Sequence, residues 1–320
     1  MVNETLGVKQ ATVGNPYCFL PQTLFQDVRP HLTFLSALNI FLSIMAFLGN
    51  VVILDALRNE SSIRPPSRLF FRCLATTDIS VGVITGPLVV FSWISMMDQD
   101  RWVHCRLTVA IVFVIGSILT QVSLLTSTAI GVDRLLALLW RLRYNREVTL
   151  KRVYAVLTAF WVISIMFGVM SIINFRAYLW FASTAITVCL VTAILTYTKI
   201  FCTLRHHQNQ TLNTFRQMTP LTLARYRNAV SSALCVQLTM VVCYLPYDVV
   251  GVVSQVLQDP SEPASSSIFL TKVYTVTLVY LNSSLNPILY CWKIASLRYA
   301  VKARIRQILC RNKLQIDSAP

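Results

Sequence analysis

The chain has 320 residues, of which only 13% are charged, and a mean hydropathy of +0.60. Soluble domains carry about 25% charged residues, so this composition excludes a soluble enzyme, a disordered chain and a small disulfide scaffold, and indicates a membrane protein. The net charge of +15 does not indicate nucleic-acid binding, because the basic residues lie between apolar runs and not on one polar face.

Seven apolar segments are long enough to cross a bilayer, which takes roughly 20 residues of helix. Backbone polar groups find no water in lipid, so each segment is predicted to be a helix. The runs are continuous, unlike the alternating strands of a membrane β-barrel. The predicted fold is therefore all-α, a seven-transmembrane helix bundle. Its spans are expected at about 33–57, 69–95, 104–139, 151–174, 178–204, 226–257 and 267–291.

The distribution of Lys and Arg predicts the orientation, because these residues favour cytoplasmic loops. With the N-terminus outside, most of them fall on the inner side. The sequence thus predicts a multi-pass plasma-membrane protein with an extracellular tail over 1–32, the bundle over 33–292, and a membrane-surface helix with a cytoplasmic tail over 293–320. The few outer basic residues are Lys9, Arg29, Arg101, Arg106, Arg176 and Lys272.

Two features of the outer side are candidates for covalent modification. Asn3 begins an Asn-Glu-Thr sequon, which is either glycosylated or too close to the terminus to be used. Of the nine Cys residues, only Cys18 and Cys105 lie clearly outside, where a disulfide can form. A Cys18–Cys105 bridge would tie the tail to the third span, and the alternative is that the two thiols stay unpaired.

Polar side chains inside the spans are costly in lipid and are therefore candidates for function. Six of them are expected to form one cluster in the bundle interior. A carboxylate surrounded by amide and hydroxyl oxygens suits a small hard cation such as Na⁺, and the alternative is a hydrogen-bond network without an ion. The cluster consists of Asn50, Asp78, Ser123, Asn282, Ser283 and Asn286.

Three prolines and one pair of charged residues suggest helix segments that can change conformation. Pro87, Pro246 and Pro287 favour helix kinks. A kink at Pro246 would let one end of the sixth span swing, although a fixed bend is equally compatible with the sequence. At the inner end of the third span, Arg134 either reaches the aqueous surface or pairs with Asp133 and holds a packing that a signal releases.

The outer half of the bundle is the expected ligand site, because pockets form between helices. Asp248 is the acid in this half, and it either pairs with a cationic ligand group or hydrogen-bonds a neighbour. The other candidate pocket residues are Gly116, Thr120, Gln121, Val252, Gln255, Thr275 and Tyr280.

A basic segment after the seventh span carries apolar residues at helical spacing, from Ile294 to Ile308. This pattern predicts an amphipathic helix on the inner leaflet. Cys310 follows it and is either palmitoylated or a free thiol.

The ordered motifs resemble those of class A, rhodopsin-like G protein-coupled receptors over nearly the whole chain. Asn286-Pro287-Ile288-Leu289-Tyr290 is a complete NPxxY motif, and the others depart from the family pattern at single positions. These are Gly49-Asn50-Val51-Val52-Ile53 for GNxxV, Asp133-Arg134-Leu135 for DRY and Cys243-Tyr244-Leu245-Pro246 for CWxP.

The second outer loop, around Asn174 to Ala177, is short and has no Cys, and Cys189 stands where the family usually has proline. These departures loosely resemble the melanocortin, lysophospholipid and cannabinoid receptors. A transporter is disfavoured because no internal repeat is visible. An intramembrane enzyme is disfavoured because no HExxH motif or pair of catalytic acids is present.

The resemblance implies a receptor that transmits an extracellular ligand signal to a heterotrimeric G protein by a two-state helix rearrangement, with membrane lipid around it. It also implies an allosteric Na⁺ at the Asp78 cluster and no other metal or cofactor. Tyr226 stands where some members have an acid that locks the arginine, so we expect appreciable basal activity. The implied switch residues are Asp133, Arg134, Tyr197, Tyr244, Pro246, Pro287 and Tyr290.

The changed motif positions Leu135 and Tyr244 keep an alternative open. In this alternative the chain is a receptor-like protein that does not signal and acts by forming heteromers with other receptors.

Overall fold

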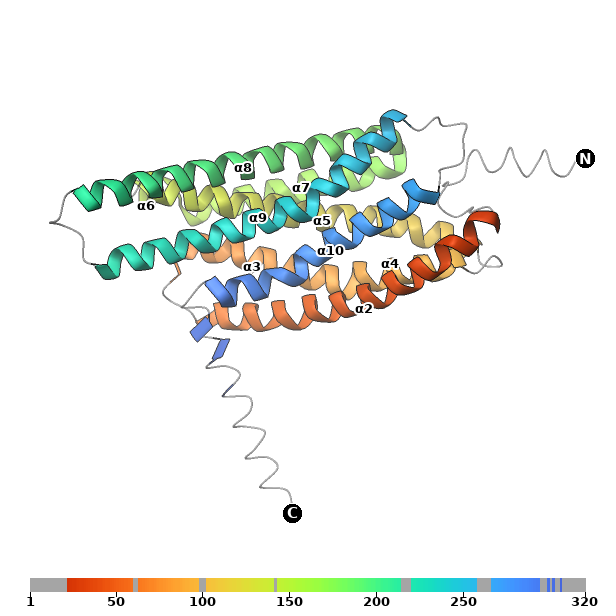
Figure 1. The fold of residues 1–320 in the computed structure, drawn as a ribbon, viewed down its shortest axis with the longest axis horizontal. Coiled ribbons are helices and arrows are strands. Elements are labelled where there is room, and N and C mark those ends of the chain that lie inside the picture. Colours follow the sequence, from red (N-terminus) through yellow and green to blue (C-terminus); the bar gives the residue numbers. More distant parts are fainter. Residues whose placement is uncertain are drawn as a thin grey trace, which may run out of the picture.

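The computed structural model describes residues 22–59, 63–97, 102–140, 143–213, 220–257, 266–293, 298–299, 301–302 and 306. Within these ranges the chain forms helices and no strand. The long helices run side by side along the long axis of the molecule (Figure 1). Asn3, Cys18 and Cys310 lie outside the described residues, so the modifications expected there stay predictions.

The helices follow the predicted spans closely. They are α2 (Gln22–Asn59), α3 (Pro65–Ser80), η2 (Val81–Thr85), α4 (Gly86–Met97), α5 (Trp102–Trp140), α6 (Tyr144–Glu147), α7 (Leu150–Ile173), α8 (Phe175–Asn213), α9 (Pro220–Leu257) and α10 (Ser266–Lys293).

The all-α bundle that the sequence predicts is confirmed, with one qualification about hydropathy. Six stretches of the described helices are apolar and long enough to cross a membrane, and they correspond to the first six predicted spans. The seventh helix, α10, packs between α9 and α2 but does not meet the same composition criterion. The reason is its polar middle, where Asn282, Ser283, Ser284 and Asn286 follow one another within five positions.

The first helix is longer than the apolar run that predicts it. α2 begins at Gln22, well before the expected start at about residue 33. Val28 and Leu32 are buried in this extension and belong to the same apolar cluster as Trp93 of α4 and Phe269 of α10. Contacts with α4 and α10 therefore extend α2 toward its N-terminus, beyond its most apolar stretch.

The second predicted span contains a π-helical turn that the sequence did not indicate. η2 joins α3 and α4 without a break, and the Gly86 N–H donates to the Val81 carbonyl group, five residues back. Pro87 follows directly and has no N–H, so regular helical bonding cannot continue through this point. The interruption expected at Pro87 therefore takes the form of one widened turn, Val81–Thr85.

The second outer loop is even shorter than expected, because only Asn174 separates α7 from α8. Its N–H donates to the Met170 carbonyl group at the end of α7. Its side-chain Oδ1 accepts the N–H of Ala177 at 3.0 Å in the first turn of α8. A single residue thus caps both helices, and this loop contributes no segment that could fold over the outer end of the bundle.

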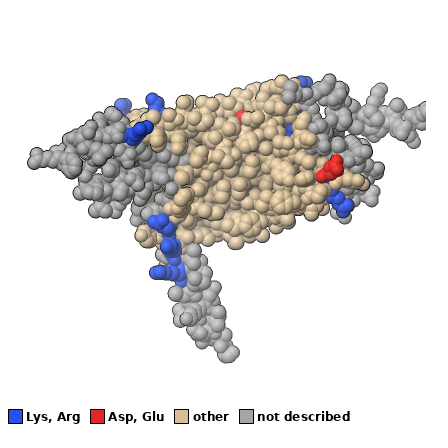
Figure 2. Space-filling view, viewed as in Figure 1, with Lys and Arg blue, Asp and Glu red and all other residues tan. Residues whose placement is uncertain are grey.

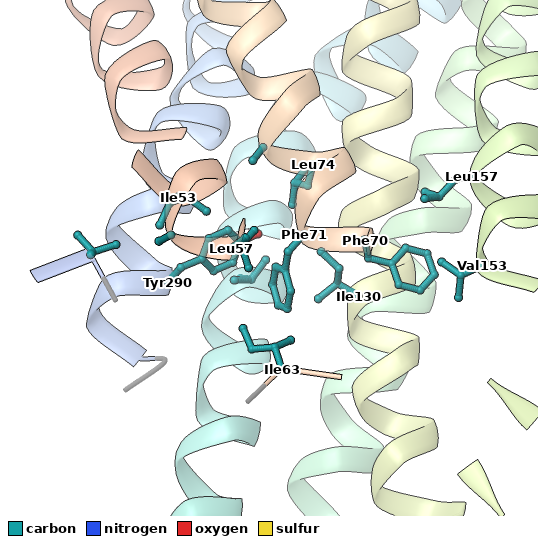
Figure 3. Packing of buried hydrophobic residues seen from close by; sticks show 14 residues of the cluster. Ile53, Leu57, Ile63, Phe70, Phe71, Leu74, Ile130, Val153, Leu157 and Tyr290 are labelled. Atoms are coloured by element: carbon teal, nitrogen blue, oxygen red, sulfur yellow. The ribbon is translucent and has the colours of Figure 1, made fainter. Parts of the chain in front are cut away.

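The inner half of the bundle is held by an apolar core between six helices, α2, α3, α5, α7, α9 and α10, shown in Figure 3. Leu57 of α2, Phe71 of α3, Ile130 of α5, Val153 of α7 and Tyr290 of α10 all belong to it. Val301 belongs to the same cluster, and the described residues beyond α10 lie at the inner end of α2 (Figure 1). Val301, an apolar residue of the predicted amphipathic helix, therefore contacts the bundle.

Close helix contact explains one residue of the first-helix motif. A Cβ atom added to Gly49 of α2 would lie 2.8 Å from Cγ of Pro287 in α10. Gly49 thus permits α2 to approach the turn of α10 that contains the NPxxY motif.

The surface has the distribution expected for a membrane-spanning bundle. Large apolar side chains are exposed along the described helices, among them Phe41, Met166, Ile172 and Val256. In Figure 2 the Lys, Arg, Asp and Glu residues gather mostly toward the two ends, with a broad band of other residues between them. This band fits the hydrocarbon layer of a bilayer.

Candidate functional site

Asp78 lies at the centre of a buried polar cluster formed by α2, α3, α5 and α10. Its side chain is fully buried. Oδ1 accepts a hydrogen bond from the Ser123 hydroxyl group at 3.1 Å, and Oδ2 accepts one from Nδ2 of Asn286 at 2.8 Å. Ser283 also contacts the carboxyl group. The described residues give Asp78 neutral partners and no cation, so its charge has to be balanced in another way.

Asn50 brings α2 into this cluster. Its Nδ2 donates to a carbonyl group of its own helix at 2.8 Å and to the Ser283 carbonyl group at 3.1 Å. Oδ1 of Asn50 and Oδ1 of Asn286 are buried without a hydrogen-bond partner. Amide oxygens near a buried carboxylate are ligands that a hard cation prefers, so these residues fit Na⁺. Asn282 fits less well, since its unpaired atom is the donor Nδ2.

At the inner end of α5, two hydroxyl groups that the sequence did not identify hold Asp133. Ser67, in the first turn of α3, donates to Oδ2 at 2.8 Å, and Tyr144 of α6 donates to Oδ1 at 2.5 Å. Arg134 is a weaker partner, because its Nε lies 3.9 Å from Asp133 Oδ2. Its guanidinium group instead lies over the ring of Phe71, 5.5 Å from the centroid. Arg134 is therefore only loosely held in this packing.

Tyr144, in the second inner loop, is buried, and the Arg64 guanidinium group lies 4.9 Å from its ring centroid. Burial, together with the neighbouring Asp133 carboxylate, raises the pKa of the Tyr144 hydroxyl group to about 12. The hydroxyl group therefore stays protonated at physiological pH and remains a donor to Asp133. No local sequence pattern marks this pairing, which depends on how the loop folds back onto α5.

The three predicted switch tyrosines lie at different levels. Tyr290 is buried in the inner core, where its ring meets that of Phe71 edge-on at 5.1 Å and its hydroxyl group has no partner. Tyr197 of α8 is partly exposed and stacks on Phe201. Tyr244 of α9 is buried at the floor of the outer cavity. Pro246 and Pro287 lie inside α9 and α10, and the structure shows one packing of each helix.

A further contact joins the inner halves of α9 and α5. Gln237 is buried, and its Nε2 donates to the Ser127 carbonyl group at 2.7 Å. A Cβ atom added to Gly131 would lie 2.4 Å from this nitrogen, so Gly131 leaves the space that the amide occupies. This amide therefore joins the inner half of α9 to α5.

The outer half of the bundle encloses a cavity of about 220 Å³. Residues from α4, α5, α8, α9 and α10 line it, so it lies where the sequence predicted a ligand site. It brings together six of the eight predicted pocket residues, namely Gly116, Thr120, Gln121, Gln255, Thr275 and Tyr280.

Asp248 and Val252 do not line this cavity, so their placement in the pocket is corrected. The lining face of α9 contains Tyr244, Tyr247 and Gly251, and a helix turns by about 100° per residue, which rotates Asp248 and Val252 away from it. Asp248 instead accepts a hydrogen bond from Thr187 of α8 at 2.7 Å. Of the two expectations for Asp248, the structure gives the hydrogen bond to a neighbour.

Sequence reasoning missed several lining residues that carry polar groups. Tyr178 and Ser183 come from α8, Ser92 comes from α4, and Lys272 comes from α10. The outer position of Lys272 was recognised from charge, but its direction toward the cavity depends on the rotation of α10.

Cys105 is buried near the outer end of α5 and is disulfide-bonded. The expected partner, Cys18, lies outside the described residues, so the pairing stays a prediction. The other Cys residues that the structure describes are free.

Comparison with known families decides the class of protein. A model of the rhodopsin family of seven-transmembrane receptors matches residues 49–192 and 172–290. The chain belongs to this family. The receptor is 23% identical over 309 residues to an adenosine receptor A3 of Ovis aries, covering 87% of this chain and 92% of the relative. It is 25% identical over 326 residues to an adenosine receptor A2b of Bos taurus, covering 89% and 95%.

A Gq-coupled rhodopsin of Mizuhopecten yessoensis is also similar, with 22% identity over 299 residues, 83% of the receptor and 58% of the relative. The family match establishes a multi-pass membrane receptor of the G protein-coupled class. The family consists of receptors and gives no indication of an enzyme.

Replacing Tyr144 by Phe should lower the basal signal of the receptor. The change removes one of the two hydroxyl donors to Asp133, so the carboxylate becomes more available to Arg134. We expect a decrease of about two- to tenfold, the equivalent of one hydrogen bond. G protein activation per receptor at the cell surface measures it. Tyr154→Phe, at an exposed position of α7, is the matched control. An unchanged or increased signal would contradict the competition between Tyr144 and Arg134.

Proposed function

We propose that the receptor lies in the plasma membrane with its N-terminus outside and transmits an extracellular ligand signal to a heterotrimeric G protein. The supporting observation is that the outer cavity and the Asp78 cluster are formed by the same or neighbouring turns of two helices. On α5, Gln121 and Leu124 line the cavity while Ser123 binds Asp78. On α10, Tyr280 lines the cavity, and Asn286 binds Asp78 less than two turns further on.

This continuity supplies a physical route for two-state behaviour. A ligand in the cavity that prefers another arrangement of α5 and α10 necessarily disturbs the groups bound to Asp78. Tyr290 follows Asn286 by one turn and packs on Phe71, over which Arg134 lies. Contacts thus extend from the cavity to the inner end of α5, where Arg134 is poorly held and available to a cytoplasmic partner.

Asp78, Asn50 and Asn286 would hold Na⁺ in this scheme, with Ser123 and Ser283 beside them. The ion would neutralise the buried carboxylate. The chain's own residues hold α2, α5 and α10 around that carboxylate, and an ion that binds there stabilises this packing over alternatives in which the helices separate.

Ligand-free G protein activation tests the function. Cells that express the receptor, Arg134→Ala, or neither should be compared for each Gα class, with surface expression measured in parallel. We expect a basal signal with the native chain that Arg134→Ala reduces to the level of untransfected cells. A native chain that reaches the surface and gives no signal in any class contradicts this proposal. That result would favour the heteromer-forming alternative suggested by Leu135 and Tyr244.

Adenosine should be included as a first ligand, because two of the similar receptors are adenosine receptors. An identity of 22–25% to these relatives does not identify the ligand of this receptor. The cavity of this receptor is therefore the better guide to the ligand.

A further inference from the structure

The one charged group in the described lining of the outer cavity is positive. Lys272 is the one charged side chain among the described lining residues, and no Asp or Glu is among them. The candidate acid Asp248 is hydrogen-bonded to Thr187 and does not line the cavity. A cationic ligand would therefore meet a like charge and no counter-ion in the described lining, whereas an anion would meet the Lys272 ammonium group.

The floor of the cavity has a different chemistry. Gln121, Tyr244 and Tyr280 are all buried there, and Gln121 is only 7% exposed. All three line the cavity, so their side-chain polar groups are available to a molecule that enters it. Buried polar groups are normally hydrogen-bonded, which favours a ligand or water that bonds to them there. Gly116 keeps the space beside the Tyr280 hydroxyl group open.

The two polar regions are separated by an apolar middle. Lys272 and Tyr280 are eight positions apart on α10, which is about 12 Å of helix. Val273 and Val276 line the cavity between them, and Val112 and Phe113 of α5 line it as well. The volume of about 220 Å³ lies below the range of about 300–1,000 Å³ that is typical for drug-sized ligands. The ligand must therefore be small and elongated.

We propose that this cavity, taken as the ligand site of the proposed receptor function, binds a small elongated anion with an apolar middle and a neutral hydrogen-bonding group at the far end. A carboxylate or a phosphate monoester pairs with Lys272 near the outer end. The neutral group bonds to Gln121, with Tyr244 and Tyr280 beside it. Lys272 already takes part in an interaction, and its three N–H donors let an anion share the ammonium group.

The orientation of the ligand follows from the Asp78 carboxylate. The floor residue Gln121 lies two positions from Ser123, which binds Asp78, so an anion at the floor would lie near a buried like charge. Near the outer end, the anion has a cation and access to water. The anionic end therefore faces outward and the neutral end inward.

Thermal unfolding of the purified receptor in lipid nanodiscs tests binding without a G protein. The probe is ω-hydroxydecanoate, whose extended chain matches the separation between Lys272 and Tyr280. Decanoate lacks the neutral group, ω-hydroxydecylamine reverses the charge, and ω-hydroxydecyl phosphate separates phosphate from carboxylate recognition. We expect a saturable rise in the unfolding temperature with at least one of the two hydroxylated anions, a smaller rise with decanoate, and none with the amine.

Variants assign the two ends of the ligand. Lys272→Gln should weaken binding of the hydroxylated anion at least about tenfold, while Lys272→Arg keeps it. Gln121→Leu should remove the advantage of ω-hydroxydecanoate over decanoate and leave decanoate binding unchanged. Lys151→Gln, an exposed position at the start of α7, is the matched control for loss of one positive charge.

The possible results separate this inference from the proposed function. Equal binding of the amine and the acid, no binding of either hydroxylated anion, or anion binding that Lys272→Gln leaves unchanged would overturn the inference. The preference of the native receptor among the probes is itself a test, so the inference can be judged even if a variant fails to fold. Anion binding in a receptor that never activates a G protein would support the inference and overturn the proposed function, and basal signalling without anion binding would do the reverse.

Discussion

Asp78→Asn should abolish the response of basal G protein activation to Na⁺. In the native receptor, replacing NaCl by choline chloride at constant ionic strength should raise the basal signal about fivefold or more, a typical size for allosteric coupling. In the variant, the two salts should give the same signal. The measurement is G protein activation in membranes, with receptor number determined separately.

The expectation follows from the surroundings of the carboxylate. Asp78 is 0% exposed, and Ser123 and Asn286 donate hydrogen bonds to it without neutralising its charge. The unpaired Oδ1 atoms of Asn50 and Asn286 add acceptors that a cation can use. A cation that binds here stabilises the packing in which α2, α5 and α10 converge, and in this packing Gln237 also holds α9 to α5.

Asp248→Asn is the matched control. Asp248 is also a buried carboxylate that accepts a hydrogen bond from a hydroxyl group, but it lies between α9 and α8 and has no comparable amide cluster. This variant should keep the native response to Na⁺. Equal responses of the native receptor and Asp78→Asn, or loss of the response in both variants, would show that the Asp78 cluster is not the Na⁺ site.

The sequence predicted well those features that depend on whether a residue favours water or lipid. A charge or an amide in an apolar run stands out, and this identified Asp78, Asn50 and Asn286 before their contacts were known. Apolar length identified the spans for the same reason. The seventh span, predicted at 267–291, is found as α10 although its central amides serve the Asp78 cluster and reduce its hydropathy.

Features that depend on helix rotation were not predictable from the sequence. One residue along a helix changes the facing direction by about 100°, so the pocket prediction included Asp248 and omitted its neighbour Tyr247. Contacts that cross helices, such as Ser67 and Tyr144 with Asp133, require the relative positions of α3, α5 and α6. The π-helical turn before Pro87 similarly depends on packing, because proline predicts an interruption but not its form.

Replacing Gln237 by Leu should raise basal G protein activation about two- to tenfold, the factor that corresponds to the loss of one hydrogen bond. Gln237 Nε2 donates to the Ser127 carbonyl group at 2.7 Å and thereby joins the inner half of α9 to α5. If α9 swings outward about Pro246, this bond breaks and the Gln237 amide loses its partner. Leucine has a similar volume and cannot form the bond, so the swing becomes easier.

Gly131→Ala disturbs the same contact from the opposite helix. Its new Cβ atom would lie 2.4 Å from Nε2 and 2.6 Å from Cδ of Gln237, so the amide would have to leave its position. We expect a higher basal signal in this variant too. The double variant with Gln237→Leu should give less than the product of the two single effects, since both changes remove one interaction.

Thr239→Val on α9 is the control for a polar group lost two positions away. The Thr239 hydroxyl group donates only to the Cys235 carbonyl group of its own helix, at 2.9 Å, so its removal should leave basal activation unchanged. A basal signal that stays at the native level in both Gln237→Leu and Gly131→Ala would contradict a restraining role for this contact. In a receptor with Tyr226 in place of a sixth-helix acid, the Gln237 amide would then have to be explained by helix packing alone, and restraint of α9 would have to come from the apolar contacts of Val236 in the inner core.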